Sequence, residues 1–208
     1  MRKELKEYAD IALKPEDGDG KIDFARIFGR SAPVHVEVGS GKGTFLVHQA
    51  EARPDVNFLG IEWARKYYLY AVDRMGRRGL RNVRIIRTEA TAFLRDLVHE
   101  ASVDCFHVYF PDPWPKKRHH KRRFLRMDNT AMLIDRLKPG GEIRIATDHA
   151  DYYEQIREVT NAYRTKLEEI PFEPPAGAAE GEATGTNFER KYLREDRPIH
   201  TAAFRKRA

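Results

Sequence analysis

One short segment of the chain, residues 110–124, combines residue types that could bind a flat aromatic molecule. Its sequence, FPDPWPKKRHHKRRF, opens with one carboxylate, Asp112, among three prolines and close to a tryptophan. Proline fixes its own φ and restricts the residue before it, so this loop should hold Asp112 in a defined position. A fixed carboxylate beside the Trp114 ring suits a flat heterocycle, which can stack on the ring and donate its N–H groups to the carboxylate. The alternative interpretation is a rigid turn around a buried tryptophan.

The same segment continues into a run of positive charge. Residues 116–123 hold six Lys and Arg and no acidic residue; the chain has 38 Lys and Arg against 32 Asp and Glu, so this run accounts for the whole excess. Such a run can neutralise several phosphates of a nucleic acid, although most charge runs are simply solvated surface. A second basic stretch, 74–87, has six Arg and no acid. We interpret it as a soluble helix end in preference to a second phosphate track.

A glycine-rich loop, EVGSGKGT at residues 37–44, follows an apolar run. A phosphate-binding P-loop is excluded, because Lys42 is followed by Gly43 and not by Ser or Thr, and the GxGxxG dinucleotide fingerprint is one residue short. The third interpretation is the GxGxG loop of an S-adenosylmethionine (AdoMet) site. The amino group and sulfonium of AdoMet suit a nearby Glu37, which would repel a pyrophosphate. A purely structural turn is the remaining alternative.

Two further acidic residues follow later apolar runs. Glu62 closes NFLGIE, about 20 residues beyond the glycine loop, where an acid accepts hydrogen bonds from ribose hydroxyls in nucleotide-binding folds. Glu89 follows VRIIRT, where a carboxylate can accept from an adenine amino group. Each acid alone could be an ordinary charged strand end. Together with Glu37 they mark the carboxyl ends of three successive strands, where ligands bind in open α/β sheets.

The elements that must position these residues alternate along the chain. We expect strands over 34–38, 57–62, 83–87, 103–110 and 142–147, and helices over 44–53, 64–75, 91–99, 124–137 and 151–167. The helix over 124–137 ends at KPGG, a helix-stop and turn signal. This order predicts an α/β fold with a parallel sheet and helices on both faces.

Taken together, these features of the chain resemble the bacterial tRNA (guanine-N7-)-methyltransferase family. The matching pieces are FGRSAPVHVEVGSGKGTFL, LGIEW, the 110–124 segment, GGEIRIATDHADY and TNFERK, in the family's order. The 110–124 segment is also similar to the Asp/Asn-Pro-Pro-Tyr/Trp motif of methyltransferases that act on planar nitrogens. The resemblance implies a Rossmann-like class I AdoMet-dependent methyltransferase fold, with a mostly parallel seven-stranded sheet and an antiparallel C-terminal strand. It also implies methylation of N7 of guanine 46 in the tRNA variable loop.

The resemblance implies roles for individual residues of this chain. The implied AdoMet contacts are Glu37, Gly39, Gly41, Glu62, Glu89 and Asp112, and Asp112 is also the implied catalytic residue. The implied substrate contacts are Lys116, Asp148, Thr186, Asn187, Phe188 and Glu189. The implied RNA-facing residues are Arg118, His119, His120, Lys121, Arg122 and Arg123. The family commonly has TKFE where this chain has TNFE, which leaves the role of Asn187 open.

The remaining sequence features concern organisation and partners. We expect an N-terminal extension over 1–30 and a single domain over 31–208, with a mobile loop at 171–185, where the chain is rich in Pro, Gly, Ala and Glu. One cysteine, Cys105, allows no internal disulfide and is expected to be buried and inert. With no membrane-length apolar segment and no signal peptide, the expected location is the cytoplasm. We expect a monomer or homodimer without an obligate protein partner.

No metal site is expected. PEDGDGKIDF, from residue 15, lacks calcium ligands at the required positions, and the histidines lack metal-ligand spacing. Two rival functions remain: an RNA-binding protein with a non-catalytic AdoMet-like pocket, and a class I methyltransferase with a substrate other than RNA.

Overall fold

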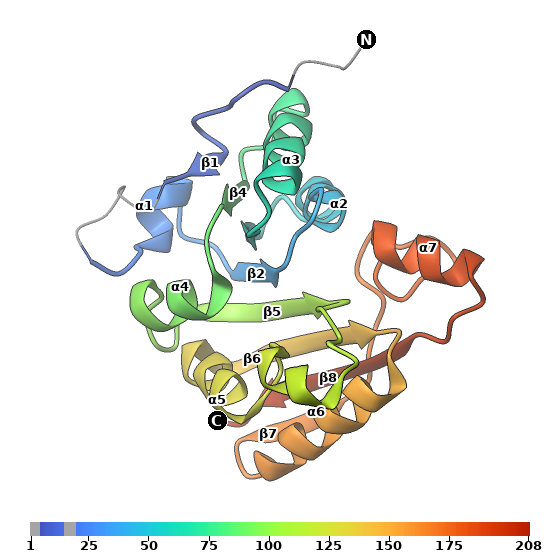
Figure 1. Ribbon diagram of the computed structural model, residues 1–208. Coiled ribbons are helices and arrows are strands. Elements are labelled where there is room, and N and C mark those ends of the chain that lie inside the picture. Colours follow the sequence, from blue (N-terminus) through green and yellow to red (C-terminus); the bar gives the residue numbers. More distant parts are fainter. Residues whose placement is uncertain (1–4, 15–19) are drawn as a thin grey trace. The chain divides into compact units, whose positions relative to one another are not determined.

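The chain forms two compact units, one up to Val98 and one from His99 onward, in a computed structural model that describes residues 5–14 and 20–208 (Figure 1). The calcium-like segment begins in residues 15–19, outside the described residues. Within the described ranges, no helix is long and apolar enough to cross a bilayer.

The first unit alternates strands and helices. Its elements are β1 (Ala12–Leu13), α1 (Phe24–Phe28), β2 (Val34–Val38), α2 (Thr44–Ala52), β3 (Asn57–Ile61), α3 (Arg65–Arg77), β4 (Val83–Ile86) and α4 (Ala90–Leu97). The strands lie in the order β1-β4-β3-β2, and all neighbouring pairs are parallel. Every residue of β3 is buried, as expected for a parallel strand covered on both faces.

Part of the expected N-terminal extension packs into this unit. Ala12 and Leu13 pair with the end of β4, and Ile11 and Phe24 are buried. Helix α1 begins where the Asp23 side chain accepts hydrogen bonds from two backbone N–H groups of the first turn. The boundary expected at residue 30 stays a prediction.

The second unit is built around β6. Its elements are β5 (Val103–Tyr109), the 3₁₀ helix η2 (Lys117–Arg122), α5 (Met127–Arg136), β6 (Leu137–Thr147), α6 (Ala150–Ala162), β7 (Leu167–Ile170), α7 (Asn187–Arg194) and β8 (His200–Lys206). Strand β6 is parallel to β5 and antiparallel to β8, and β8 is antiparallel to β7. Two antiparallel pairs therefore follow the parallel ones near the C-terminus.

The predicted order of elements is confirmed. Each of the five expected strands is present, and the described residues contain eight strands because β1 precedes the seven that were expected. Helix α5 ends at Arg136, one residue before its expected end, and the KPGG turn appears as a bulge in β6, where Gly140 has a φ of 77°. Helix α6 ends at Ala162, earlier than expected.

Candidate active site

The glycine loop of the first unit is held against its neighbours. The N–H groups of Gly39 and Ser40 donate to the carbonyl of Ile61 at the end of β3, at 2.9 and 3.0 Å. Gly43 has a φ of 67° and lies so close to α3 that an added Cβ would be 2.9 Å from the Cβ of Ala71. Glycine is therefore required at position 43 by backbone conformation and by packing, which the sequence spacing alone did not reveal.

Glu37 is a buried carboxylate with an unused oxygen. It lies near the end of β2, is 4% exposed, and its Oε2 atom has no hydrogen-bond partner among the described residues. Burial raises the pKa of Glu37 to about 8; a hydrogen bond from Ser40 partly offsets this rise, and the negative charge of Glu62 adds to it. A carboxylate in this position is suited to a cationic group of a ligand, because the cation would satisfy both its charge and its free oxygen.

Glu62 connects the glycine loop to the next helix. Its Oε2 atom accepts the N–H of Gly41 and its Oε1 atom accepts the N–H of Ala64, each at 2.7 Å. Each carboxylate oxygen has two lone pairs, so Glu62 can still accept a ligand hydroxyl. The carboxylate thus orders the loop in addition to its expected ligand contact.

Glu89 begins α4 as its N-terminal cap. Its carboxylate accepts the N–H groups of Thr91 at 2.9 Å and Ala92 at 2.7 Å. Burial acts to raise the pKa of Glu89, but these hydrogen bonds prevail and hold the pKa below its usual range. Because β2, β3 and β4 are adjacent and parallel, the structure brings Glu37, Glu62 and Glu89 to the same edge of this sheet.

Asp112 lies in a loop with two unusual backbone conformations. Phe110 and Trp114, on either side of it, have φ angles of 51° and 44°. Bulky residues rarely adopt this left-handed region, at a cost of about 1–3 kcal/mol each. The Asp112 side chain is exposed between them. The loop therefore presents the carboxylate between two strained residues, each of which precedes a proline, and the defined position expected for Asp112 stays a prediction.

The Trp114 ring is half-buried, and the basic run covers it. The guanidinium of Arg122 lies 4.9 Å from the centroid of the Trp114 ring. The His119 ring packs edge-to-face against the same ring, with 5.8 Å between the two centroids. The run forms η2, from Lys117 to Arg122. Its exposed side chains are Lys116, Lys117, Arg118, Lys121 and Arg122, whereas His119 and His120 are half-buried.

Arg123 behaves differently from the rest of the run. It is 1% exposed, donates to the carbonyl of Pro113 at 2.7 Å and to Gln155 at 2.9 Å, and forms an ion pair with Asp151. Its guanidinium also lies 4.8 Å from the centroid of the Tyr152 ring. These contacts correct the expected RNA-facing role of Arg123, because its charge is already used to anchor the Asp112 loop and the basic run to α6.

Asp148 is close to residues that the sequence did not single out. Its side chain is 6% exposed and ion-paired with Arg197. The Arg197 guanidinium lies 4.3 Å from the Tyr192 ring centroid, and the Phe110 ring is 5.5 Å from the same ring. Burial raises the pKa of Tyr192, and the Asp148 and Asp112 carboxylates add to this rise while Arg197 opposes it. The carboxylates of Asp148, Glu195 and Asp112 thus all act on Tyr192 in this unit.

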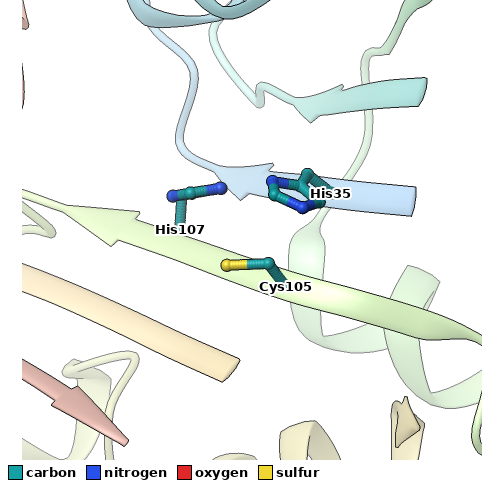
Figure 2. Close-up of side chains that lie close together, drawn as sticks. All are labelled: His35, Cys105 and His107. Atoms are coloured by element: carbon teal, nitrogen blue, oxygen red, sulfur yellow. The ribbon is translucent and has the colours of Figure 1, made fainter. Parts of the chain in front are cut away.

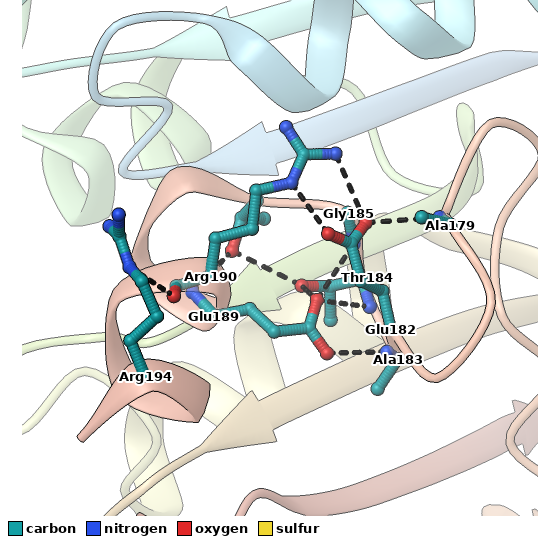
Figure 3. A network of polar contacts seen from close by, with 9 residues as sticks. Ala179, Glu182, Ala183, Thr184, Gly185, Glu189, Arg190 and Arg194 are labelled. Carbon is teal, nitrogen blue, oxygen red and sulfur yellow. Dashed lines mark hydrogen bonds and ion pairs between the residues drawn. The ribbon is translucent and has the colours of Figure 1, made fainter. Parts of the chain in front are cut away.

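The segment before α7 is built on Glu189, which is buried (Figure 3). Its carboxylate accepts the N–H groups of Thr184 and Gly185, each at 2.8 Å, as well as the N–H of Ala183. Thr186 caps α7 by accepting the N–H of Glu189 at 3.1 Å. Glu189 and Thr186 therefore shape the segment, and direct contact with a substrate stays a prediction for both.

Two neighbours on α7 are better placed to meet a ligand. Asn187 and Phe188 are exposed, and the Phe188 side chain is 44% exposed. The expected mobile loop at 171–185 is joined to α7, because Arg190 donates to Glu182 at 2.6 and 3.0 Å. Its mobility stays a prediction.

Most of the second basic stretch has partners within its own unit. Arg77 is paired with Asp73 at 2.8 Å, and Arg78 with Glu51 at 2.8 Å. Arg84 donates to the carbonyl of Ile27 at 3.1 Å. These contacts support the interpretation of this stretch as a helix end.

Strand β5 carries a buried thiol and a buried imidazole (Figure 2). Cys105 is buried as expected, and burial raises the pKa of its thiol far above the usual range, which favours the protonated form; its inertness stays a prediction. His107 makes a hydrogen bond to the Tyr109 hydroxyl at 2.9 Å.

Sequence relatives of the chain are methyltransferases. A family described as "Putative methyltransferase" matches residues 31–202. The tRNA (guanine-N(7)-)-methyltransferase of Mycobacterium sp. strain KMS is 41% identical over 159 residues, which cover 74% of this chain and 58% of the relative. The protein of the same name from Rhodopirellula baltica is 35% identical over 204 residues, or 93% of this chain and 73% of that one. The chain thus spans less than two thirds of the mycobacterial relative.

Solved structures share the fold. A methyltransferase from Pyrococcus furiosus has a TM-score of 0.59 at 18% identity, covering 95% of this chain and 89% of that one. A 30S ribosomal A1408 methyltransferase from an uncultured bacterium has a TM-score of 0.59 at 14% identity, covering 89% and 95%. At these identities the similarity concerns the fold alone, and it confirms the expected class I methyltransferase architecture.

Proposed function

The chain belongs to the tRNA (guanine-N(7)-)-methyltransferase family, and from this premise we propose that it transfers a methyl group from AdoMet to N7 of a guanine in tRNA. The target is guanine 46 in the variable loop, and the reaction takes place in the cytoplasm. The observation that carries the proposal is the free carboxylate oxygen of the buried Glu37, because the ionised form of this group is suited to a cationic ligand group such as the amino group of AdoMet.

The acids of the first unit fit AdoMet by their chemistry. Glu37 offers a buried carboxylate to the amino group, which bears positive charge at neutral pH. Glu62 retains lone pairs for ribose hydroxyls, and Glu89 for an adenine amino group. When bound, AdoMet supplies a methyl carbon made electrophilic by its sulfonium.

Guanine N7 needs alignment more than it needs a base. It carries a free lone pair at neutral pH, so it can form the new N–C bond without first losing a proton, while the C–S electron pair leaves with sulfur. Catalysis is then mainly positioning of the nucleophile. The guanine ring also gains a positive charge as the bond forms.

Asp112 is proposed to do two things for the guanine. Its exposed carboxylate accepts hydrogen bonds from guanine N–H groups, which orients N7, and its negative charge stabilises the positive charge that develops on the ring. Asp148 is a second acceptor near Tyr192, and its ion pair with Arg197 must loosen or rearrange for it to take that role.

The exposed cations of the basic run are proposed to bind the tRNA backbone. Lys116, Lys117, Arg118, Lys121 and Arg122 all reach solvent within a short stretch after the Asp112 loop. Phosphate contacts made here would hold the RNA so that its guanine reaches Asp112, with affinity that falls steeply as salt rises.

One assay separates this function from its rivals. The purified protein is incubated with methyl-labelled AdoMet and tRNA, and the RNA is digested to nucleosides; labelled 7-methylguanosine is the expected product. A tRNA with adenine in place of guanine 46 is the matched control and should gain no label. AdoMet binding without transfer to RNA would favour a different substrate, and RNA binding without AdoMet binding would favour the non-catalytic rival.

A further inference from the structure

The start of α3 carries an unusual group of exposed aromatic side chains. Trp63 is 70% exposed, Tyr67 39% and Tyr70 41%. These three account for half of the six large exposed apolar side chains in the described part of the chain, and they lie within eight residues of one another. Packing of α3 against the core does not explain these exposed rings, because other residues of the helix make the core contacts.

The helical period separates the two tyrosine rings from the core-facing residues. Lys66 and Tyr67 lie four and three residues before Tyr70, which places these three side chains on one face of α3, and Trp63 lies just before the helix begins. Ala71, Val72 and Met75 are completely or almost completely buried on the other side. The helix is thus fixed by its apolar residues and presents the rings to solvent.

Positive charge surrounds the rings. Residues 63–72 include Arg65 and Lys66, both exposed, and no acidic residue. The ammonium group of Lys42, from the glycine loop, lies 5.9 Å from the Tyr70 ring centroid. The next acid along the helix, Asp73, is buried and paired with Arg77.

We propose that this aromatic face, formed by Trp63, Lys66, Tyr67 and Tyr70 with Lys42, binds RNA by stacking unpaired bases on its rings. Aromatic rings flanked by cations are the combination that binds single-stranded nucleic acid, since the rings stack on bases and the cations meet phosphates. A second copy of the chain fits less well, because a two-fold contact here would bring the same cations together. The proposal rests on the proposed function, in which RNA is the substrate, and adds a contact outside the basic run.

The test removes the rings and leaves the charges. The affinity of the full chain for a short, unstructured, fluorescently labelled oligoribonucleotide is measured at several salt concentrations for the wild type, for Tyr67→Ala/Tyr70→Ala and for Tyr67→Phe/Tyr70→Phe. Met127→Ala, which removes an exposed apolar side chain of the second unit, is the control. Trp63 stays unchanged because it follows Glu62 directly.

Loss of both rings should weaken RNA binding by about tenfold or more per stacked base, with an unchanged salt dependence because no phosphate contact is lost. The Phe pair and the Met127 variant should bind as the wild type does, and AdoMet affinity should be the same in all four proteins. Unchanged RNA affinity in the Ala pair overturns the proposal. So does a parallel loss of AdoMet affinity, or a change in self-association alone.

The methylation assay keeps this proposal separate from the proposed function. A wild type that methylates tRNA and an Ala pair that binds RNA equally well refute only the aromatic face. If the wild type transfers no methyl group to tRNA, while the Ala pair binds the oligoribonucleotide more weakly than the wild type does, the proposed function is refuted and the aromatic face is supported.

Discussion

Replacing Glu37 with glutamine should stabilise the free protein and weaken AdoMet binding at the same time. In the folded protein the pKa of Glu37 is about 8 against an ordinary value of 4.5, and the side chain is 4% exposed. The folded protein therefore keeps a proton that the unfolded chain releases. As a result, this group makes the free energy of unfolding fall as pH rises from 4.5 to about 8, with no further change above that.

The size of the effect follows from the same two values. At 1.36 kcal/mol per pKa unit, the gap between 4.5 and about 8 corresponds to about 5 kcal/mol at pH 8 and above, and to about 3 kcal/mol at pH 7. Glutamine does not titrate, so Glu37→Gln should lack this fall. Urea unfolding of both proteins at pH 5, 6.5 and 8 measures it, and Glu154→Gln, at an exposed site on α6, should keep the wild-type pH dependence.

Ligand binding should respond in the opposite direction. Loss of the buried carboxylate should weaken AdoMet binding by about 10- to 100-fold, as expected for a hydrogen bond to a charged group. Wild-type AdoMet affinity, measured by calorimetry, should rise between pH 6 and 7.5 because the bound cation favours the ionised carboxylate, and the variant should lose this rise. Equal pH profiles for the two proteins, in stability or in binding, would refute the assigned role of Glu37.

The remaining predictions concern the second unit. Asp112→Asn should lower single-turnover methyl transfer to tRNA by about 100-fold, and near-normal turnover would contradict its catalytic role. Lys121→Gln should weaken tRNA binding and reduce the salt slope by about one, whereas an unchanged slope would exclude a phosphate contact. Arg123→Ala should instead lower the free energy of unfolding by about 2 kcal/mol, and unaltered stability would argue against its anchoring role. Glu189→Gln should speed amide hydrogen exchange at residues 183–185, and unchanged exchange would show that its charge is not needed there.

The local pattern of the chain was sufficient to predict the main elements and the acids at the strand ends. Buried parallel strands appear in the sequence as short apolar runs, and β2 occupies the expected residues 34–38. Glu37, Glu62 and Glu89 could be located in advance because each lies at or shortly after the end of its strand, and adjacent parallel strands end at the same edge of a sheet.

What only the tertiary structure decided is which charged side chains are available. Arg123 and Lys121 belong to one run in the sequence, yet Arg123 is buried because it meets Asp151 and Gln155, which lie 28 and 32 residues further along the chain. Likewise, the ion pair of Asp148 depends on Arg197, from a segment with no motif. Composition and spacing report local preference, but burial and pairing depend on contacts between distant segments, and those are fixed only when the chain packs.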